Sequence, residues 1–375
     1  MSVPHPQLDG DARFLVDLVS TPSISGRERA AAELFVDRAR AWGFDADIDE
    51  ATNAVAHRGP ADAAIHVVLL GHIDTVAGDI PVRIEDGVLH GRGSVDAKGP
   101  LAAMLAAARR ADMPAGVRLT VAGAAGEETP MSPGARHLVD RWRPDACIIG
   151  EPSGWDGVTL GYKGRLLAAA TATCPHHHSA GRDPSAADLA FAWWRGVLGY
   201  ADAFNADCGR VFDGIQASMQ DMHSDCDGLT QRASIDAGFR LPVGVEPAVL
   251  AEQLRAMAPA GVQIECRGME RAHATDRSDP VVRALTSAIR TNGGRPRPKL
   301  KTGTADLNVV GPAWRCPIAA YGPGDSTLDH TPDERLPLDE FGRSIDVLAD
   351  AIASLIDELC AADPATASGV PQRVG

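Results

Sequence analysis

The stretch Gly71-His72-Ile73-Asp74-Thr75 ends an apolar run, and two further polar motifs follow it: Gly91-Arg92-Gly93-Ser94-Val95-Asp96-Ala97-Lys98-Gly99 and Gly126-Glu127-Glu128. Three more polar positions come in order behind them, namely Glu151, His178 and His330. Most of these groups lie just beyond apolar runs that are typical of buried strands. Ligand-binding groups collect beyond the carboxyl ends of strands in open α/β sheets, so the pattern predicts a metal site at a sheet edge.

Strand and helix patterns alternate around these motifs. Ser25, with Glu28 three residues later, has the pattern of a capping box at a helix start. Asp86-Gly87 predicts a hairpin turn. The other predicted elements of this part are helices over 11–19 and 101–110 and strands over 65–70, 117–121 and 146–149. Such alternation predicts an α/β fold with a largely parallel or mixed sheet that is covered on both faces.

The length favours two domains, because single cores stop growing near about 250–300 residues and this chain has 375. The texture changes after Lys163-Gly164, where strands over 166–173, 234–241 and 262–266 and helices over 186–198 and 247–257 predict a smaller α+β domain. Helix–strand alternation resumes from Pro280, with elements over 281–290, 317–321 and 338–359. We therefore expect a discontinuous catalytic domain, 1–163 and 275–375, interrupted by a domain over 164–274. The tail after Ala361 has a composition typical of disorder.

Composition excludes several classes of function. The net charge is −14, from 36 basic and 50 acidic residues, so no general attraction to nucleic acid or to an anionic membrane is expected. The first 17 residues lack a signal-peptide pattern, and no apolar run approaches the ~20 residues that span a bilayer. The seven cysteines contain no CxxC pair, so neither a disulfide framework nor a thiolate zinc site is expected. We expect a cytoplasmic enzyme.

The polar motifs supply the ligands of a two-metal site. Two divalent cations about 3.5–4 Å apart need a bridging carboxylate and further ligands at roughly 2.0–2.2 Å. We assign Asp96 as the bridge, His72 and Glu151 to one ion, and Glu128 and His330 to the other. Such a set accepts Zn²⁺, Co²⁺ or Mn²⁺, and Zn²⁺ is the expected ion.

Two neighbouring carboxylates complete the predicted chemistry. Asp74 stands two residues after His72, where it is expected to accept the proton of the distal imidazole nitrogen and so to orient the ring. Glu127 stands beside a predicted ligand but points differently, so it is expected to act as the general base. It would take a proton from a water molecule and return it to the leaving amine. The prediction is a metal-dependent amidohydrolase.

The order and spacing of HxD, GRGxxDxKG, GEE, a later acidic ligand and a late histidine resemble the M20 family of metal-dependent aminoacylases, deacetylases and carboxypeptidases. The resemblance runs from Pro22 to the last predicted helix. It implies that the inserted domain is a lid that also forms a homodimer contact. It further implies that His178 reaches the partner subunit's site and stabilises the oxyanion of the tetrahedral intermediate. Cys174 replaces the usual glycine four positions earlier, so His176 and His177 remain alternatives.

Within that family, the segments 160–165 and 301–309 look most like the branch of lysine and ornithine biosynthesis. Those enzymes release the amino acid from the C-terminal glutamate of a small acidic amino-group carrier protein. Arg240 resembles the lid arginine that holds the substrate α-carboxylate. The candidate substrate contacts in the second segment are Thr304, Asp306 and Asn308, the last two for an ammonium group.

A basic stripe gives the carrier hypothesis a physical reason. Arg295, Arg297, Lys299 and Lys301 alternate with residues that include two prolines, so they are expected to share one face of an extended segment. Such a face would attract an acidic protein. The alternative interpretation is a solvated edge strand that keeps sheets apart.

Two other functions remain open at this point. One is deacylation of N-acetyl-ornithine, N-acetyl-lysine or N-succinyl-diaminopimelate by the same chemistry. The other is a metal-free binding relative that keeps the fold without turnover. The complete set of acidic and imidazole groups argues against the second, because such a relative has no reason to keep it.

Overall fold

The chain divides into two units and enters the second of them twice. The computed structural model describes residues 8–178 and 180–362. The first unit consists of the described residues up to Leu160, of Thr275–Lys299, and of the described residues from Val309 on. The second unit consists of Gly161–Ala274 and Leu300–Asn308. The segment 300–308 therefore belongs to the second unit, although the sequence placed it in the first domain.

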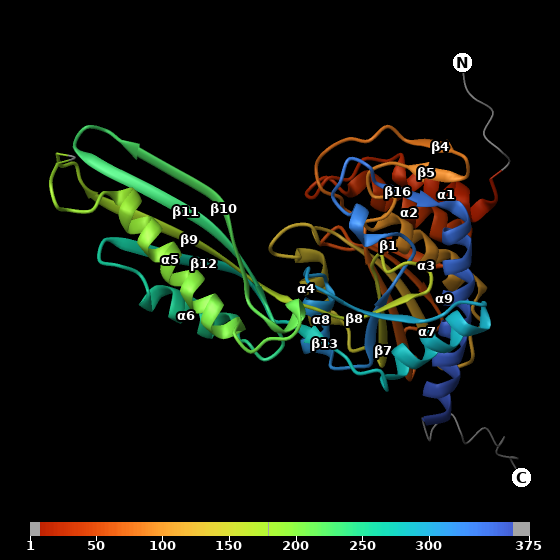
Figure 1. The fold of residues 1–375 in the computed structure, drawn as a ribbon. Helices are drawn as coiled ribbons and strands as arrows, with labels where there is room; N and C mark the ends of the chain where they lie inside the picture. The colour runs from red at the N-terminus through yellow and green to blue at the C-terminus, as the bar shows by residue number, and fades with distance from the viewer. Residues whose placement is uncertain (1–7, 179, 363–375) are drawn as a thin grey trace, which may run out of the picture. The chain divides into compact units, whose positions relative to one another are not determined.

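Helices and strands alternate in the first part of the chain (Figure 1). In order, the elements are α1 (Gly10–Val19), α2 (Arg29–Ala41), β1 (Asp45–Ile48), β2 (Ala54–Arg58), β3 (Ile65–His72), β4 (Arg83–Glu85), β5 (Val88–His90), α3 (Lys98–Arg110), β6 (Val117–Ala124), α4 (Pro133–Arg141), β7 (Ala146–Gly150) and β8 (Gly157–Tyr162). After residue 274 come α7 (Pro280–Thr291), β14 (Arg297–Lys301), α8 (Leu307–Trp314), β15 (Ile318–Tyr321), the 3₁₀ turn η2 (Ser326–Leu328), β16 (Arg335–Pro337) and α9 (Leu338–Ala362).

The main sheet contains, in this order, the neighbouring strands β1-β2-β6-β3-β7-β15-β8, and β14 also pairs with β8. The four central strands β6, β3, β7 and β15 are parallel, whereas β2 and β8 join antiparallel at either side of them. Strand β3 is buried at every position except His66, because helices cover both faces of the sheet. The mixed α/β sheet that the sequence predicts is confirmed. Its parallel strands place their carboxyl ends at one edge.

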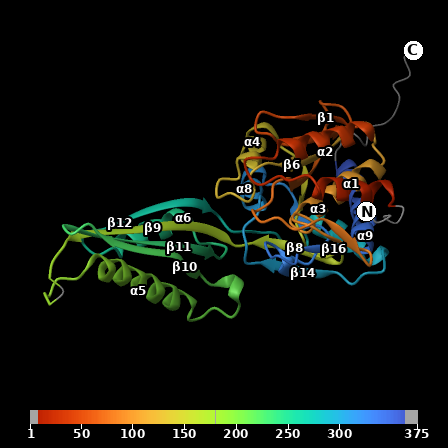
Figure 2. The same ribbon diagram turned by 90° about the horizontal axis from the view of Figure 1, so that it is seen from above.

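The second unit is an antiparallel sheet with helices on one face (Figure 2). Its elements are β9 (Gly164–Pro175), α5 (Ala186–Asn205), the 3₁₀ turn η1 (Val211–Asp213), β10 (Gln216–Cys226), β11 (Thr230–Leu241), α6 (Pro247–Ala256), β12 (Val262–Glu270) and the short β13 (His273–Ala274). The strand order is β10-β11-β9-β12. Trp193 of α5 is fully buried, and its indole N–H donates to the carbonyl of Leu254 in α6 at 3.0 Å. This contact joins the two helices over the alternately buried residues of β9 and β11.

Two details differ from the predictions. Helix α2 begins at Arg29 after the N-cap Glu28, so Ser25 is not its cap. The Ser25 hydroxyl instead donates to Asp74 Oδ2 at 2.7 Å. Strand β10 was not predicted, because it is exposed at nearly every position and therefore lacks an apolar alternation. The predicted disorder of the tail concerns mainly residues 363–375, which lie outside the described residues.

Across the described part of the chain, each helix is either too short or too polar to cross a lipid bilayer.

Candidate metal centre and active site

The carboxyl ends of three parallel strands carry the predicted site residues. His72 is the last residue of β3, and Glu151 directly follows β7. Glu127 and Glu128 stand three and four residues beyond the end of β6, after a turn at Gly126. Gly126 has φ +74°, and a Cβ there would lie 2.8 Å from Pro133, so only glycine makes this turn without strain. Strand register therefore delivers the groups to one edge.

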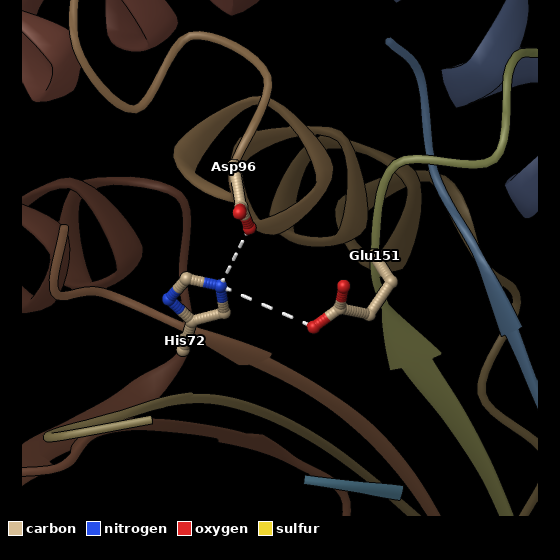
Figure 3. Close-up of side chains that lie close together, drawn as sticks. All are labelled: His72, Asp96 and Glu151. Carbon is tan, nitrogen blue, oxygen red and sulfur yellow. Dashed lines mark hydrogen bonds and ion pairs between the residues drawn. The ribbon is translucent and has the colours of Figure 1, made fainter. Parts of the chain in front are cut away.

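One cluster of possible ligands lies around His72 (Figure 3). His72 Nε2 is 3.1 Å from Asp96 Oδ1 and 4.0 Å from Glu151 Oε1. All three side chains are nearly buried. Their ligand atoms lie within 4.8 Å of one another, close enough to hold one ion.

A second cluster lies on the other side of Asp96. His330 Nε2 is 3.1 Å from Asp96 Oδ2 and 3.0 Å from Glu128 Oε2. Thus the two oxygens of one carboxylate face two different imidazoles. This is the arrangement that a bridging ligand between two cations needs, and it brings together all five residues assigned as ligands from the sequence.

The electrostatics of the edge favour positive charge. Burial by itself would lower the pKa of His72, but the carboxylates of Asp74 and Asp96 outweigh it and raise that pKa well above its usual range. Asp96 and Glu128 raise the pKa of His330 to about 10. Burial raises the pKa of the Glu128 carboxyl. The negative charge that stabilises protonated imidazoles here would also stabilise divalent cations. With such cations bound, the imidazoles would be neutral ligands.

Asp74 has more partners than the sequence predicted. His72 Nδ1 lies 3.5 Å from Asp74 Oδ1 and 3.1 Å from the Asp74 carbonyl oxygen, so the ring is oriented by both. The backbone N–H groups of Glu127 and Glu128 also donate to the two carboxylate oxygens, each at 3.1 Å. The carboxylate therefore links the imidazole to the loop of the predicted base. Glu127 in turn has an oxygen within 4.8 Å of ligand atoms of His72 and Glu128.

Sequence reasoning missed Glu334, which is 1% exposed. Its Oε1 accepts the backbone N–H groups of Val95 and Asp96 at 2.9 and 3.0 Å, and its Oε2 accepts from Arg92 Nη1 at 2.8 Å. This glutamate therefore holds the backbone of the predicted bridging residue. The only signal in the sequence was an acidic residue four positions after His330.

The predicted substrate contacts lie in the second unit. Arg240 Nη1 donates to Thr304 Oγ1 at 2.7 Å, so Thr304 orients the guanidinium. The Asn308 amide donates to the carbonyls of Arg271 and Lys163, at 2.7 and 3.2 Å, so its N–H groups are used within the fold. Asp306 is buried, with 3% of its surface exposed.

The three consecutive histidines differ in their surroundings. His176 Nδ1 lies 3.4 Å from Cys226 Sγ, and His177 Nε2 lies 3.3 Å from the Pro184 carbonyl oxygen. His178 is exposed, and its Nδ1 accepts the backbone N–H of Ala180 at 3.1 Å. Its Nε2 has no hydrogen-bond partner among residues 8–178 and 180–362. His178 thus presents an open ring nitrogen, which is what its predicted role requires.

The basic stripe is not a free cationic face. Arg297 pairs with Asp156, and Lys299 Nζ donates to the Ser153 carbonyl at 2.6 Å. Lys301 Nζ lies 5.6 Å from the centre of the Tyr162 ring. Pro298 and Leu300, which alternate with the cations, are also exposed, so both faces of the strand contact solvent. Strand β14 does place Arg297, Lys299 and Lys301 at alternating positions, but each of the three contacts another group of the fold, so the stripe is not a free cationic face.

Residues 68–354 match the model of peptidase family M20/M25/M40. A protein of Deinococcus radiodurans named LysW-lysine hydrolase is 46% identical over 360 residues, which cover 94% of this chain and 99% of that protein. A protein of Thermococcus kodakarensis, named for hydrolysis of LysW-lysine and LysW-ornithine, is 41% identical over 91% of both chains.

Solved structures agree in fold. The M20 metallo-carboxypeptidase Sso-CP2 of Sulfolobus solfataricus superposes with a TM-score of 0.73 at 17% identity, over 93% of this chain and 99% of that one. The YXEP protein of Bacillus subtilis, described as a dinuclear metal-binding peptidase of the M20 family, gives 0.65 at 12% identity, over 92% and 97%. The family match covers most of the chain and includes all five ligands of the two clusters. The chain therefore belongs to peptidase family M20/M25/M40 and is a hydrolase of amide bonds.

Proposed function

We propose that this hydrolase releases lysine, or ornithine, from a small acidic amino-group carrier protein during amino-acid biosynthesis in the cytoplasm. The observation that carries the chemistry is Asp96, whose two oxygens face His72 and His330 at 3.1 Å each. The names of the similar proteins support the substrate, because they specify LysW-lysine and LysW-ornithine.

The donor set fits two divalent cations. His72, Asp96 and Glu151 would hold one, and Asp96, Glu128 and His330 the other. Imidazole nitrogen and carboxylate oxygen suit Zn²⁺, with Co²⁺ and Mn²⁺ as alternatives. When bound, such ions polarise the scissile carbonyl and lower the pKa of water.

The protein's own groups handle the proton. Glu127 stands at the same edge as the ligands without belonging to either of their two clusters. We assign it to take a proton from the attacking water and to return it to the leaving amine. Asp74 orients the His72 ring and accepts the backbone N–H of Glu127 at 3.1 Å, so it fixes the position of the base relative to the ligand.

The second unit is assigned to substrate recognition and to a homodimer contact. Arg240, oriented by Thr304, would bind the α-carboxylate through its two-pronged guanidinium. Asp306 is assigned to an ammonium group of the substrate. Asn308 is assigned to holding the backbone, because its amide already has two carbonyl partners. His178 is assigned to the oxyanion of the partner subunit's site, which its open Nε2 permits.

A substrate panel tests this function. Purified enzyme with added Zn²⁺ or Co²⁺ is incubated with LysW-lysine, LysW-ornithine, N-acetyl-lysine, N-acetyl-ornithine and N-succinyl-diaminopimelate, and the products are identified by mass spectrometry. We expect the carrier conjugates to have the highest kcat/KM. Cleavage of the free acyl amino acids alone would contradict the carrier substrate.

Two variants separate catalysis from ion binding. Glu127→Gln should lower kcat by about 10²–10⁴-fold and keep the metal content of the wild type. Asp96→Asn should lower the metal content, measured by elemental analysis, because the amide nitrogen cannot bridge. Near-normal turnover of Glu127→Gln would refute the assignment of the base. Fewer than one ion per wild-type subunit, without amidase activity, would favour a binding protein.

A further inference from the structure

A cationic groove runs along helix α7 in the first unit, and none of the metal-site residues lines it. The groove encloses about 430 Å³. Arg277, Arg283 and Arg290 line it together with Val282, Pro296 and Pro298. Its volume falls within the ~300–1,000 Å³ of sites that hold drug-sized ligands, so it has room for several side chains of a partner.

The arginines are held on a rigid support. Arg283 and Arg290 are seven residues apart on α7, so they project from the same face of the helix, two turns apart. The opposite face of α7 is buried through Val281, Leu285 and Ile289. Pro296 and Pro298 form another part of the wall, and proline keeps φ fixed. The helix therefore fixes the backbone positions of Arg283 and Arg290 along the groove.

The charge of the groove is opposite to that of the chain. Every ionisable side chain that lines the groove is an arginine, whereas the chain carries a net charge of −14. Arg283 is partly neutralised, since it pairs with Glu358. Arg277 and Arg290 are exposed, and their guanidinium groups form no hydrogen bond or ion pair with any described residue. Two guanidinium groups thus remain available, and this side chain binds carboxylates by two parallel hydrogen bonds.

We propose that this groove docks an acidic segment of the protein that carries the substrate, an inference that rests on the proposed function. The basic stripe of the sequence does not meet this need, because Arg297 and Lys299 already have partners within the first unit. The apolar floor at Val282 accepts the side-chain stems of an extended segment, and Arg277 and Arg290 accept its carboxylates. The contact would raise the affinity and the association rate for a substrate that is attached to the carrier protein. It would contribute nothing to the binding of a small free substrate.

Charge reversal tests the docking surface. The variants are Arg290→Glu and the double variant Arg277→Glu/Arg290→Glu. Arg13→Glu is the matched control, because Arg13, like Arg290, is an exposed arginine on a helix of the first unit whose guanidinium has no hydrogen bond or ion pair with a described residue. Steady-state kinetics are measured with LysW-lysine and with N-acetyl-lysine or another small acyl-lysine that the wild type cleaves, at low and high salt. Thermal unfolding verifies that each variant is folded.

The double variant should raise KM for LysW-lysine about tenfold or more at low salt and much less at high salt, since surface charge pairs are screened. Its kcat, and its kcat/KM for the small substrate, should stay within about twofold of the wild type. An unchanged KM for LysW-lysine, or an equal rise in Arg13→Glu, overturns the groove as docking surface while the proposed function stands. A wild-type enzyme that cleaves only free acyl amino acids overturns the proposed function and this partner with it.

Discussion

Asp74 Oδ1 accepts the backbone N–H of Glu127 at 3.1 Å, across a separation of 53 residues. The same carboxylate accepts from the Ser25 hydroxyl and orients His72. It is 0% exposed, so these contacts replace water completely. This one side chain thereby fixes the orientation of a candidate ligand, His72, and the position of the loop that carries the candidate base, Glu127.

Replacing this carboxylate by its amide should therefore affect ion binding and turnover together. In Asp74→Asn one acceptor oxygen becomes a donor, so it can no longer satisfy the N–H of Glu127, the N–H of Glu128 and the Ser25 hydroxyl at once. We expect a loss of about 10–100-fold in metal affinity or activity, measured by competition with a chelator and by kcat. Asp79→Asn, an exposed aspartate of the following loop, is the control. Equal behaviour of the two variants would show that Asp74 has no positioning role.

Glu334→Gln should destabilise the first unit. The glutamate is buried, and its partner Arg92 has a side chain that is 13% exposed, so the variant leaves a buried guanidinium beside an amide N–H group. Breaking a buried pair of this kind costs about 3–5 kcal/mol. Urea unfolding followed by tryptophan fluorescence measures the change, with exposed Asp333→Asn as the control. A shift no larger than that of the control would mean that water reaches this site.

Acid should weaken the fold through two histidines of the main sheet. His57 on β2 and His66 on β3 each lie 2.8 Å from the Thr120 hydroxyl of β6. Burial, assisted by the charge of Arg118, lowers the pKa of each to about 4. In the unfolded chain their pKa is about 6.5. The unfolded state therefore binds more protons between these values, and the stability that these residues provide above about pH 6.5 is lost as the pH falls toward 4.

The double variant His57→Gln/His66→Gln isolates this contribution. It should lose less stability than the wild type between pH 7 and pH 4.5, whatever its stability at pH 7. Urea midpoints at several pH values measure the difference between the two slopes, and exposed His223→Gln serves as the control. Parallel curves for wild type and double variant would place the acid sensitivity elsewhere.

His178 can be tested by mixing two inactive variants. His178→Ala and Glu127→Gln should each have low activity alone. If His178 acts in the partner subunit's site, a mixed dimer contains one site with both groups intact, so random mixing should recover roughly a quarter of the wild-type activity. His176→Ala, whose ring contacts Cys226, replaces His178→Ala in a control experiment. Absence of recovery, with exchange of subunits verified by size and labelling, would exclude action across a dimer.

Some features were readable from the sequence because they depend on local pattern. The apolar runs before His72 and before Glu151 are the strands β3 and β7, and Asp86-Gly87 is the turn between β4 and β5, with φ of +48° and +77°. These elements are decided by periodicity and by the few residues that tolerate positive φ. The metal-dependent chemistry was predictable for a different reason: any one of these imidazole and carboxylate groups alone is more often structural, but five of them in this order match the ligand set of a two-metal site.

Other features escaped because their cause is not local. The stripe 295–301 has the alternation of an open cationic face, yet Asp156 and the Ser153 carbonyl lie more than 140 positions away along the chain and engage two of its members. Strand β10 is polar and exposed. It is held in place by its pairing with β11 over ten residue pairs and not by burial of its own side chains. No periodicity of its own residues records such a partner.

The sequence by itself determined which groups stand at the strand ends, because burial of alternating or continuous apolar residues selects the strands and the polar residues that follow them. Tertiary structure decided how those groups meet. Parallel pairing of β6, β3 and β7 brings Glu128, His72 and Glu151 to one edge, and Glu334 holds the Asp96 backbone so that its two oxygens face different histidines. Hydrogen bonds act over about 3 Å of space and are indifferent to the number of residues between donor and acceptor.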